Sequence, residues 1–233
     1  MTQSVWAASL NNLPDLEQWQ KPHLELPQGD LVYPDWFEGT WQVTCTETAQ
    51  LALLAPDIVT PGFESNRRYL NEPVEFPVRF RPSYSPFLTN SILAIVKPGI
   101  VGDRAFNGWA IARAYLGDRA VLSVKVDPDN PNRQVTFLSG QRQLIATITG
   151  RRRREMDGDR FLATEISQQV FRSPSQIYFN EVEITTDYQR LDDDRILADQ
   201  VAAIYLSPQD PDYFTAANRP VALYRYRLQL QRQ

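Results

Sequence analysis

The residue types that most often perform chemistry are scarce in this chain. His23 and Cys45 are the only histidine and the only cysteine among its 233 residues. A nucleophilic relay needs a histidine as its base, and His23 lies in the proline-flanked segment KPHLELP near the N-terminus. One cysteine allows no internal disulfide. The sequence therefore disfavours a relay hydrolase, a zinc site and the disulfide framework of small secreted domains.

Paired carboxylates are the next candidates, because two acids in different environments can divide the roles of acid and base. Glu183 and Asp199 fall near the centres of predicted strands, and Glu47 follows Cys45 on the apolar side of another. We expect Glu47 to mark the exit of that strand to solvent. The sequence therefore predicts no catalytic residue.

Two acidic segments could bind a cation. DPDNPN at 127–132 offers side-chain oxygens, but a helix–loop–helix calcium site needs a glycine at its sixth position and an acid at its twelfth. Those positions hold Asn132 and Leu138. DDD at 192–194 lacks a second set of ligands, which is typical of a solvated turn. We predict no metal site.

Four consecutive arginines at 151–154 precede EMDGDR, and a hairpin with Asp-Gly at its tip would turn two of them to each side of the sheet. One interpretation is a site for a carboxylate or phosphate, such as a tetrapyrrole propionate or a lipid head group. The preferred one is a solvated hairpin in which the arginines pair with Glu155, Asp157 and Asp159.

The segment GFESNRRYLNEP at 62–73 is rich in polar and turn residues, and long ordered loops often carry function. The alternative is a structural loop whose arginines pair with Asp35 or Glu38. Aromatic side chains near this loop could line a cavity for an apolar ligand. The candidate ligand-binding residues are Trp41, Arg67, Arg68, Tyr69, Trp109, Tyr224 and Tyr226.

Alternation of apolar and polar residues indicates the strands that position these side chains. It is clear in GTWQVTCTE at 39–47 and in ALYRYRLQLQRQ at 222–233. Turn residues separate further predicted strands at 72–81, 120–127, 133–139, 142–152, 160–171, 178–191 and 196–207. Closing such a meander removes its unpaired edges. We therefore predict a mainly β fold, one antiparallel closed barrel of about 8–10 strands over 36–233.

Two segments differ from this pattern. Apolar residues recur at helical spacing in DRAFNGWAIARAYLG at 103–117, which predicts one short helix near 107–116. Asp103 or Asn107 could cap its start and Gly117 could end it. Residues 1–35 are rich in proline and show little periodicity, so we expect an extended arm.

The G-x-W start formed by Gly39 and Trp41 resembles that of lipocalin-type barrels. That resemblance implies that Trp41 plugs one end of the barrel while Gly39 permits close backbone approach. It also implies an arginine from the last strand stacked on the indole. Arg225, Arg227 and Arg232 are the candidates, and we prefer Arg225 or Arg227.

Longer strings resemble an uncharacterised family of cyanobacteria and plastids: YPDWFEGTW, DIVTPGFESNRRYLNEPVEF, FNGWAIARAYLG and VDPDNPNRQ. The resemblance covers 29–134 and implies a photosynthetic cell, a cleaved leader and a thylakoid-associated or lumenal setting, with no established reaction. SVWAASL at 4–10 is compatible with a leader remnant, whereas the initiating methionine keeps a cytoplasmic setting open.

Charge and hydropathy narrow the possible partners. A net charge of −4 supplies no basic excess for nucleic acid, and no apolar run is long enough to span a membrane as a helix.

Three hypotheses about the function remain. The preferred one is a non-enzymatic, lipocalin-like protein that binds an apolar ligand such as a pigment or lipid for a photosynthetic-membrane process. The second is an accessory or assembly factor that docks on a thylakoid protein complex through the arm and the 61–73 loop. The third is a cavity isomerase or lyase that uses carboxylates. The sequence does not identify a cofactor.

Overall fold

The computed structural model describes residues 13–58, 60–83 and 99–233. The SVWAASL segment, with its expected leader remnant, lies outside these residues. In the described part of the chain, no helix has the length and apolar character needed to cross a bilayer.

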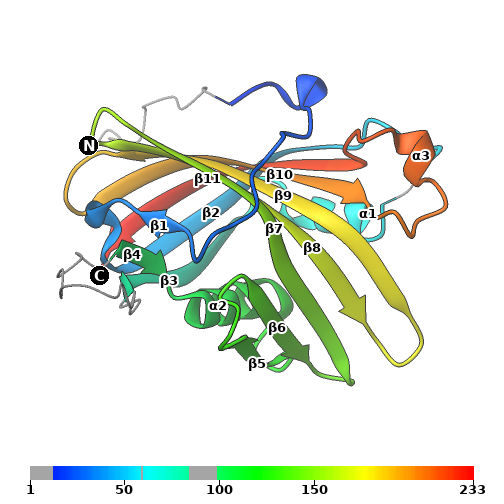
Figure 1. Cartoon of the computed structure of the whole chain (residues 1–233), viewed down its shortest axis with the longest axis horizontal. Coiled ribbons are helices and arrows are strands. Elements are labelled where there is room, and N and C mark those ends of the chain that lie inside the picture. The colour runs from blue at the N-terminus through cyan, green and yellow to red at the C-terminus, as the bar shows by residue number, and fades with distance from the viewer. Residues whose placement is uncertain (1–12, 59, 84–98) are drawn as a thin grey trace, which may run out of the picture.

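The described residues form one strongly curled antiparallel sheet of eleven strands, in the order β1-β4-β3-β2-β11-β10-β9-β8-β7-β6-β5 (Figure 1). Strands from β5 to β11 pair in sequence order, and β2 continues the sheet beside β11. The bounds are β1 Val32–Tyr33, β2 Gly39–Leu51, β3 Pro73–Ser83, β4 Gly99–Gly102, β5 Val121–Val126, β6 Arg133–Leu138, β7 Arg142–Met156, β8 Arg160–Arg172, β9 Ile177–Arg190, β10 Arg195–Leu206 and β11 Ala222–Arg232.

The prediction of a closed barrel is wrong, although the mainly β antiparallel fold is confirmed. In the part that the structure describes, β1 and β5 are the two edges of the sheet and do not pair with each other. The helix α2 (Arg104–Leu116) lies between them and contacts both β3 and β5. β1 has two residues and β5 has six, so neither edge offers a long ladder for closure. Packing against α2 takes the place of strand pairing.

The helical elements are short apart from α2. Asp103 accepts a hydrogen bond from the backbone N–H of Phe106 at 3.2 Å, and this cap starts α2 before the predicted 107. Gly117 ends the helix with φ near 85°. The other helical segments, absent from the sequence prediction, are η1 Leu16–Gln18, η2 Asp35–Phe37, α1 Phe63–Asn66, η3 Arg67–Tyr69 and α3 Tyr213–Ala216.

The described part of the arm crosses the convex face of the sheet (Figure 1). Trp19 packs there in a buried cluster with Val201, Ala203, Tyr205 and Leu223. The arm then forms a single bridge to β7 between Glu25 and Arg151, and ends as β1 beside β4. It is therefore part of the folded body rather than a free extension.

The main core fills the concave face, and Trp41 lies at one end of it with 0% of its surface exposed. Its indole N–H donates to the backbone oxygen of Phe37 at 2.8 Å. The guanidinium of Arg232 lies 4.3 Å from the centre of the indole ring. Gly39 has φ near 123°, and a Cβ added there would lie 2.7 Å from a guanidinium nitrogen of Arg232. The stacking expected from the lipocalin resemblance is present, and Gly39 permits it.

Arg225 and Arg227 were the wrong choice for this stacking. Arg232 shares its side of β11 with Leu228 and Leu230, which face the concave core, whereas the odd-numbered residues of β11 point to the convex face. Arg225 accordingly pairs with Asp199, its guanidinium Nε donating to the carboxylate at 3.0 Å.

We expect Trp41→Ala to lower the free energy of unfolding by roughly 3–5 kcal/mol, because it removes a fully buried ring from the core. Urea unfolding measures this change. The matched control is Trp109→Ala, at a position 36% exposed on α2, where a loss of about 1 kcal/mol or less is expected. Equal losses in the two variants would contradict the role assigned to Trp41.

Candidate functional site

The curled sheet and α2 enclose a pocket of about 330 Å³ on the concave face. Its size falls within the range of small-molecule sites. Apolar and aromatic side chains form most of its wall, with Asn107 and Gln200 as polar exceptions. The lining residues from the sheet are Tyr33, Val43, Cys45, Phe76, Val78, Phe80, Ile184, Tyr188, Gln200, Ala202, Tyr226, Leu228 and Leu230.

Two local patterns create this space. One face of α2 lines the pocket, because its residues Asn107, Ile111 and Tyr115 are spaced four apart along the helix. On β10 the inward position between Gln200 and Ile204 is Ala202, whose small side chain leaves room. Ile111 remains 37% exposed, which places the opening of the pocket beside α2.

A second pocket of about 280 Å³ adjoins the first, and Tyr115 and Tyr226 line both. Its other walls are Glu47, Asn66, Arg68, Tyr69 and Leu116. Unlike the first pocket, it contains a carboxyl group and a guanidinium. An apolar chamber and a polar one thus lie side by side, with the rings of Tyr115 and Tyr226 at their common boundary.

Glu47 is the unusual residue of the polar chamber. It is 3% exposed, and its Oε1 has no hydrogen-bond partner among the described residues. Burial raises the pKa of Glu47 to about 7, and the nearby charge of Arg67 opposes this only in part. The expectation that Glu47 marks an exit to solvent is wrong.

A β-bulge in β2 directly follows Glu47. Glu47 pairs with Tyr226 while Ala49 pairs with Arg225, so Thr48 is the extra residue. Gln50 therefore lies opposite Tyr224, and its side-chain amide is also buried without a hydrogen-bond partner in the described part of the chain. The bulge brings two polar side chains to the same face of one strand.

Cys45 lines the apolar chamber two residues before Glu47. The Tyr115 hydroxyl donates to its sulfur at 3.6 Å. Burial raises the pKa of the Cys45 thiol, although the hydrogen bond from Tyr115 opposes the shift. A thiol in this state is a poor nucleophile at neutral pH.

The predicted working loop forms one wall of the polar chamber. Arg68 lies over the ring of Tyr69 at 4.7 Å, and the Tyr69 hydroxyl donates to the backbone oxygen of Tyr115 at 2.8 Å. Arg67 pairs with Glu64 at 3.2 Å. The loop is therefore fastened to α2 through Tyr69.

The sequence profile of one family, described as a domain of unknown function (DUF6816), matches residues 25–233. The chain belongs to this family. The match includes the C-terminal half, where the sequence suggested only generic β-structure. No curated protein and no solved structure matches the chain.

The structure brings together only some of the residues predicted for the site of this DUF6816 chain. Arg68, Tyr69 and Tyr226 line the polar chamber, and Tyr226 also lines the apolar one. Tyr224 packs beside Phe63, outside both chambers. The other predicted residues do not line either chamber. Trp41 lies in the main core, and Arg67 pairs with Glu64. Trp109 lies on the outer side of α2 with Arg113 over its ring, and Arg225 and Arg227 lie on the convex face.

Sequence reasoning missed Tyr115 and misjudged Glu47. A usable signal existed for Glu47, because it continues the inward series of Val43 and Cys45. Tyr115 could have been found from its four-residue spacing after Ile111. The bulge that completes the site has no comparable signal in the sequence.

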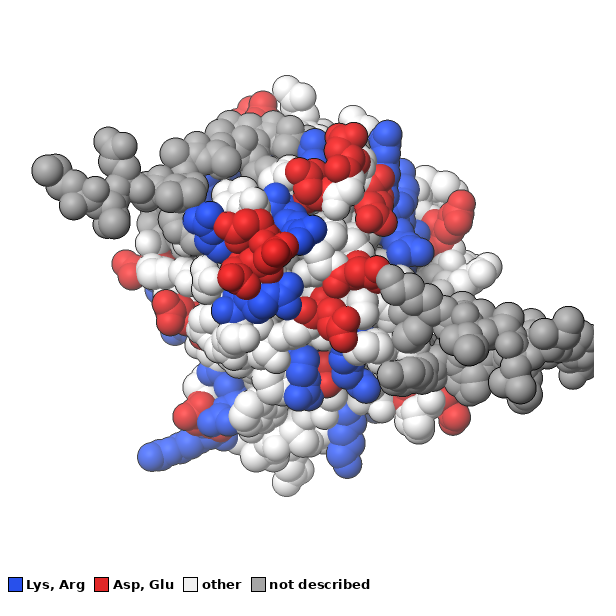
Figure 2. Space-filling model, turned by 90° about the vertical axis from the view of Figure 1, so that its left-hand side faces the viewer, with Lys and Arg blue, Asp and Glu red and all other residues white. Residues whose placement is uncertain are grey.

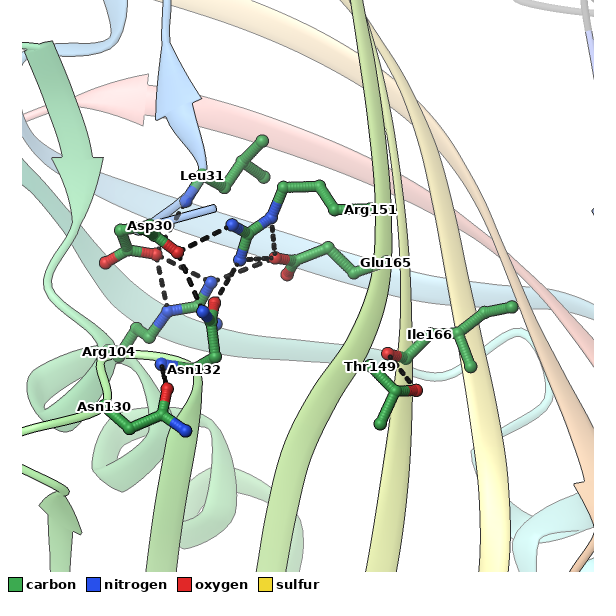
Figure 3. A network of polar contacts seen from close by, with 10 residues as sticks. Asp30, Leu31, Arg104, Asn130, Asn132, Thr149, Arg151, Glu165 and Ile166 are labelled. Carbon is green, nitrogen blue, oxygen red and sulfur yellow. Dashed lines mark hydrogen bonds and ion pairs between the residues drawn. The ribbon is translucent and has the colours of Figure 1, made fainter. Parts of the chain in front are cut away.

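The arginine run holds the arm to the sheet, and Arg104 holds the start of α2 to the same Glu165 that Arg151 contacts. Arg151 donates to Glu165 at 2.8 Å and to the side-chain oxygen of Asn132 at 2.6 Å (Figure 3). Arg104 at the start of α2 donates to Asp30 at 2.8 Å and to Glu165 at 3.0 Å. The expected Asp-Gly turn is present, with positive φ at Asp157 and Gly158. The acid paired with Arg151 is Glu165 rather than one from the turn.

Charged side chains of both signs are interspersed on the face of the molecule seen in Figure 2. Within the described ranges, no cluster of three or more histidine, cysteine or acidic residues could hold a metal ion. The buried acids of the convex face are already bonded: Asp187 accepts from Arg160 at 2.7 Å, and Glu183 accepts from Tyr205 at 2.7 Å. Glu47 therefore stands apart from the other buried acids.

The raised pKa of Glu47 predicts a pH-dependent difference between the protein and its Glu47→Gln variant. The folded protein holds the Glu47 proton more tightly than the unfolded chain does. The contribution of Glu47 to the free energy of unfolding is therefore fully present below the usual pKa of 4.5, and it is lost as the pH rises to about 7. Glu47→Gln cannot titrate at this position and does not lose this contribution. Its free energy of unfolding minus that of the wild type should therefore increase by about 3 kcal/mol from pH 4.5 to pH 8.

Urea unfolding at the two pH values checks the prediction. Glu75→Gln is the matched control, because Glu75 is exposed on the other side of β3. Its difference from wild type should change little with pH. A pH-independent difference for Glu47→Gln would contradict the buried, proton-holding state.

Proposed function

We propose that this chain is a non-enzymatic, lipocalin-like binding protein that takes an apolar small molecule into the chamber between its curled sheet and α2. The observation that carries the proposal is the 330 Å³ chamber, whose wall is mainly apolar and aromatic. Removing an apolar ligand from water there would be favourable by about 25 cal/mol for each Å² buried. Closure of the sheet is not required, because α2 covers the concave face.

Catalysis by paired carboxylates has weaker support. Glu47 lines the polar chamber, whereas Glu183 and Asp199 lie on the convex side of the sheet and are bonded there. An acid and a base do not converge on the chamber within the described residues. We therefore rank the isomerase or lyase hypothesis third.

Docking on a protein complex ranks second. It was expected to use the arm and the 61–73 loop, yet Trp19 and Tyr69 of these segments pack against the chain itself. A thylakoid-associated or lumenal setting, and a role for the ligand in a photosynthetic-membrane process, remain proposals that rest on the sequence resemblance.

Binding of the neutral fluorophore N-phenyl-1-naphthylamine tests the proposal directly. Its fluorescence should rise on entry into the chamber and saturate. Ala202→Leu should weaken binding by about tenfold, because the larger side chain fills space in the wall. Ala114→Leu, the same change at an exposed position of α2, should leave binding unchanged. A fluorophore that does not bind, or that binds equally to both variants, would contradict the proposal.

Native mass spectrometry of protein purified from its own cells tests for a natural ligand. We expect an adduct that disappears on denaturation, since the chamber holds its ligand only while the sheet and α2 are folded. A protein without an adduct that also fails to bind the fluorophore would favour docking.

A further inference from the structure

Glu47 is not explained by an apolar ligand alone. Its carboxyl group is buried, one of its oxygens has no hydrogen-bond partner among the described residues, and it lines the polar chamber. A buried polar group left without a partner costs free energy, and more when it is charged. A ligand that supplied the missing partner would recover this free energy.

The groups around Glu47 do not supply that partner. The cations nearest in the fold belong to η3, where Arg67 pairs with Glu64 of α1 and Arg68 lies over Tyr69. Burial raises the pKa values of four neighbouring groups and so keeps them neutral at physiological pH: Cys45 from β2, Tyr115 from α2, and Tyr224 and Tyr226 from β11. Oε1 of Glu47 is thus left without a hydrogen bond from any described residue, and a bound ligand could supply one.

The positions of the two chambers determine the shape of a suitable ligand. Tyr115 and Tyr226 line both spaces, so the apolar chamber meets the polar one at these two rings. Cys45 borders the apolar side and Glu47 the polar side, two residues apart on the same face of β2. A molecule that occupies both chambers must therefore be apolar along its body and polar at one end.

We propose that Glu47 recognises the polar end of an amphipathic ligand that terminates in a hydrogen-bond donor, with a primary amine preferred over an alcohol. The apolar body of this ligand lies in the 330 Å³ chamber. The inference rests on the proposed binding function and specifies its ligand class.

The order of preference follows from charge. An ammonium group donates charge-assisted hydrogen bonds to a carboxylate, and these are about twice as strong as neutral ones. A hydroxyl donates one neutral hydrogen bond and leaves the charge of Glu47 without a counterion. A ligand carboxylate would place two acids side by side, so that one of them would have to take up a proton.

Isothermal titration calorimetry at pH 8 with decylamine, 1-decanol and decanoate tests the proposal, because the three probes share one chain length and differ only at the polar end. Decylamine is protonated at this pH. We expect it to bind at least about tenfold more tightly than 1-decanol, and decanoate to bind most weakly.

Substitution of the acceptor provides the second measurement. Glu47→Gln should reduce the affinity for decylamine by at least about tenfold and remove the preference over 1-decanol. Glu75→Gln, which removes one acid from the opposite side of the sheet, should retain the wild-type order. The comparison of three probes on the wild-type protein does not depend on how well any variant folds.

The outcomes separate this inference from the proposed function. If N-phenyl-1-naphthylamine binds but the three probes bind equally, or if Glu47→Gln retains the amine preference, the inference is overturned and the apolar-ligand function stands. Tightest binding of decanoate would overturn it in favour of recognition by Arg68. If neither the fluorophore nor any probe binds, the proposed function itself fails.

Discussion

The contact between Arg232 and Trp41 links the last strand of the sheet to the first long one. Arg232 closes β11, the last strand, and Trp41 lies near the start of β2, the first long one. The guanidinium stacks on the indole and also donates to backbone oxygens of Trp36 and Glu38 in the segment before β2. Because β2 and β11 are neighbours, this contact reinforces the ladder that joins the β5–β11 meander to the β1–β4 part of the sheet. The concave core, and with it the apolar chamber, depends on this junction.

The open sheet has a direct effect on the site. A closed barrel would have strands on every side of its interior. Here α2 forms one wall, and it brings Ile111 and Tyr115 against the sheet. The helix is held at its first residue, where Arg104 bonds to Asp30 and Glu165. One wall of the chamber is thus a helix held at its start by Arg104 and near its end by the hydrogen bond from Tyr69 to Tyr115.

The sequence predicted local structure well and global geometry poorly. Period-two alternation and turn residues located the long strands, and Gly117 identified the end of α2, whereas its start at Arg104 lies before the predicted 107. These signals are local, because they arise from one segment at a time. Closure, by contrast, depends on the edge strands, and β1 and β4 are too short to produce a pattern. The choice between Arg225, Arg227 and Arg232 was open to local reasoning, since only Arg232 shares the side of Leu228 and Leu230. The bulge at Thr48 could not be predicted from local sequence, because it depends on the pairing of β2 with β11.

The free edge at β5 bears on how the molecule avoids self-association. An unpaired strand offers backbone donors and acceptors on which another chain can add a strand. β5 has an irregular register with β6 between Val121 and Ser123, and it carries the exposed Lys125. The irregular pairing disturbs the row of backbone groups on β5, and Lys125 would have to lose its hydration if another strand were added. Both features make the β5 edge a poor site for pairing with another chain. The sheet can thus stay open beside α2 while its β5 edge has little tendency to pair with another chain.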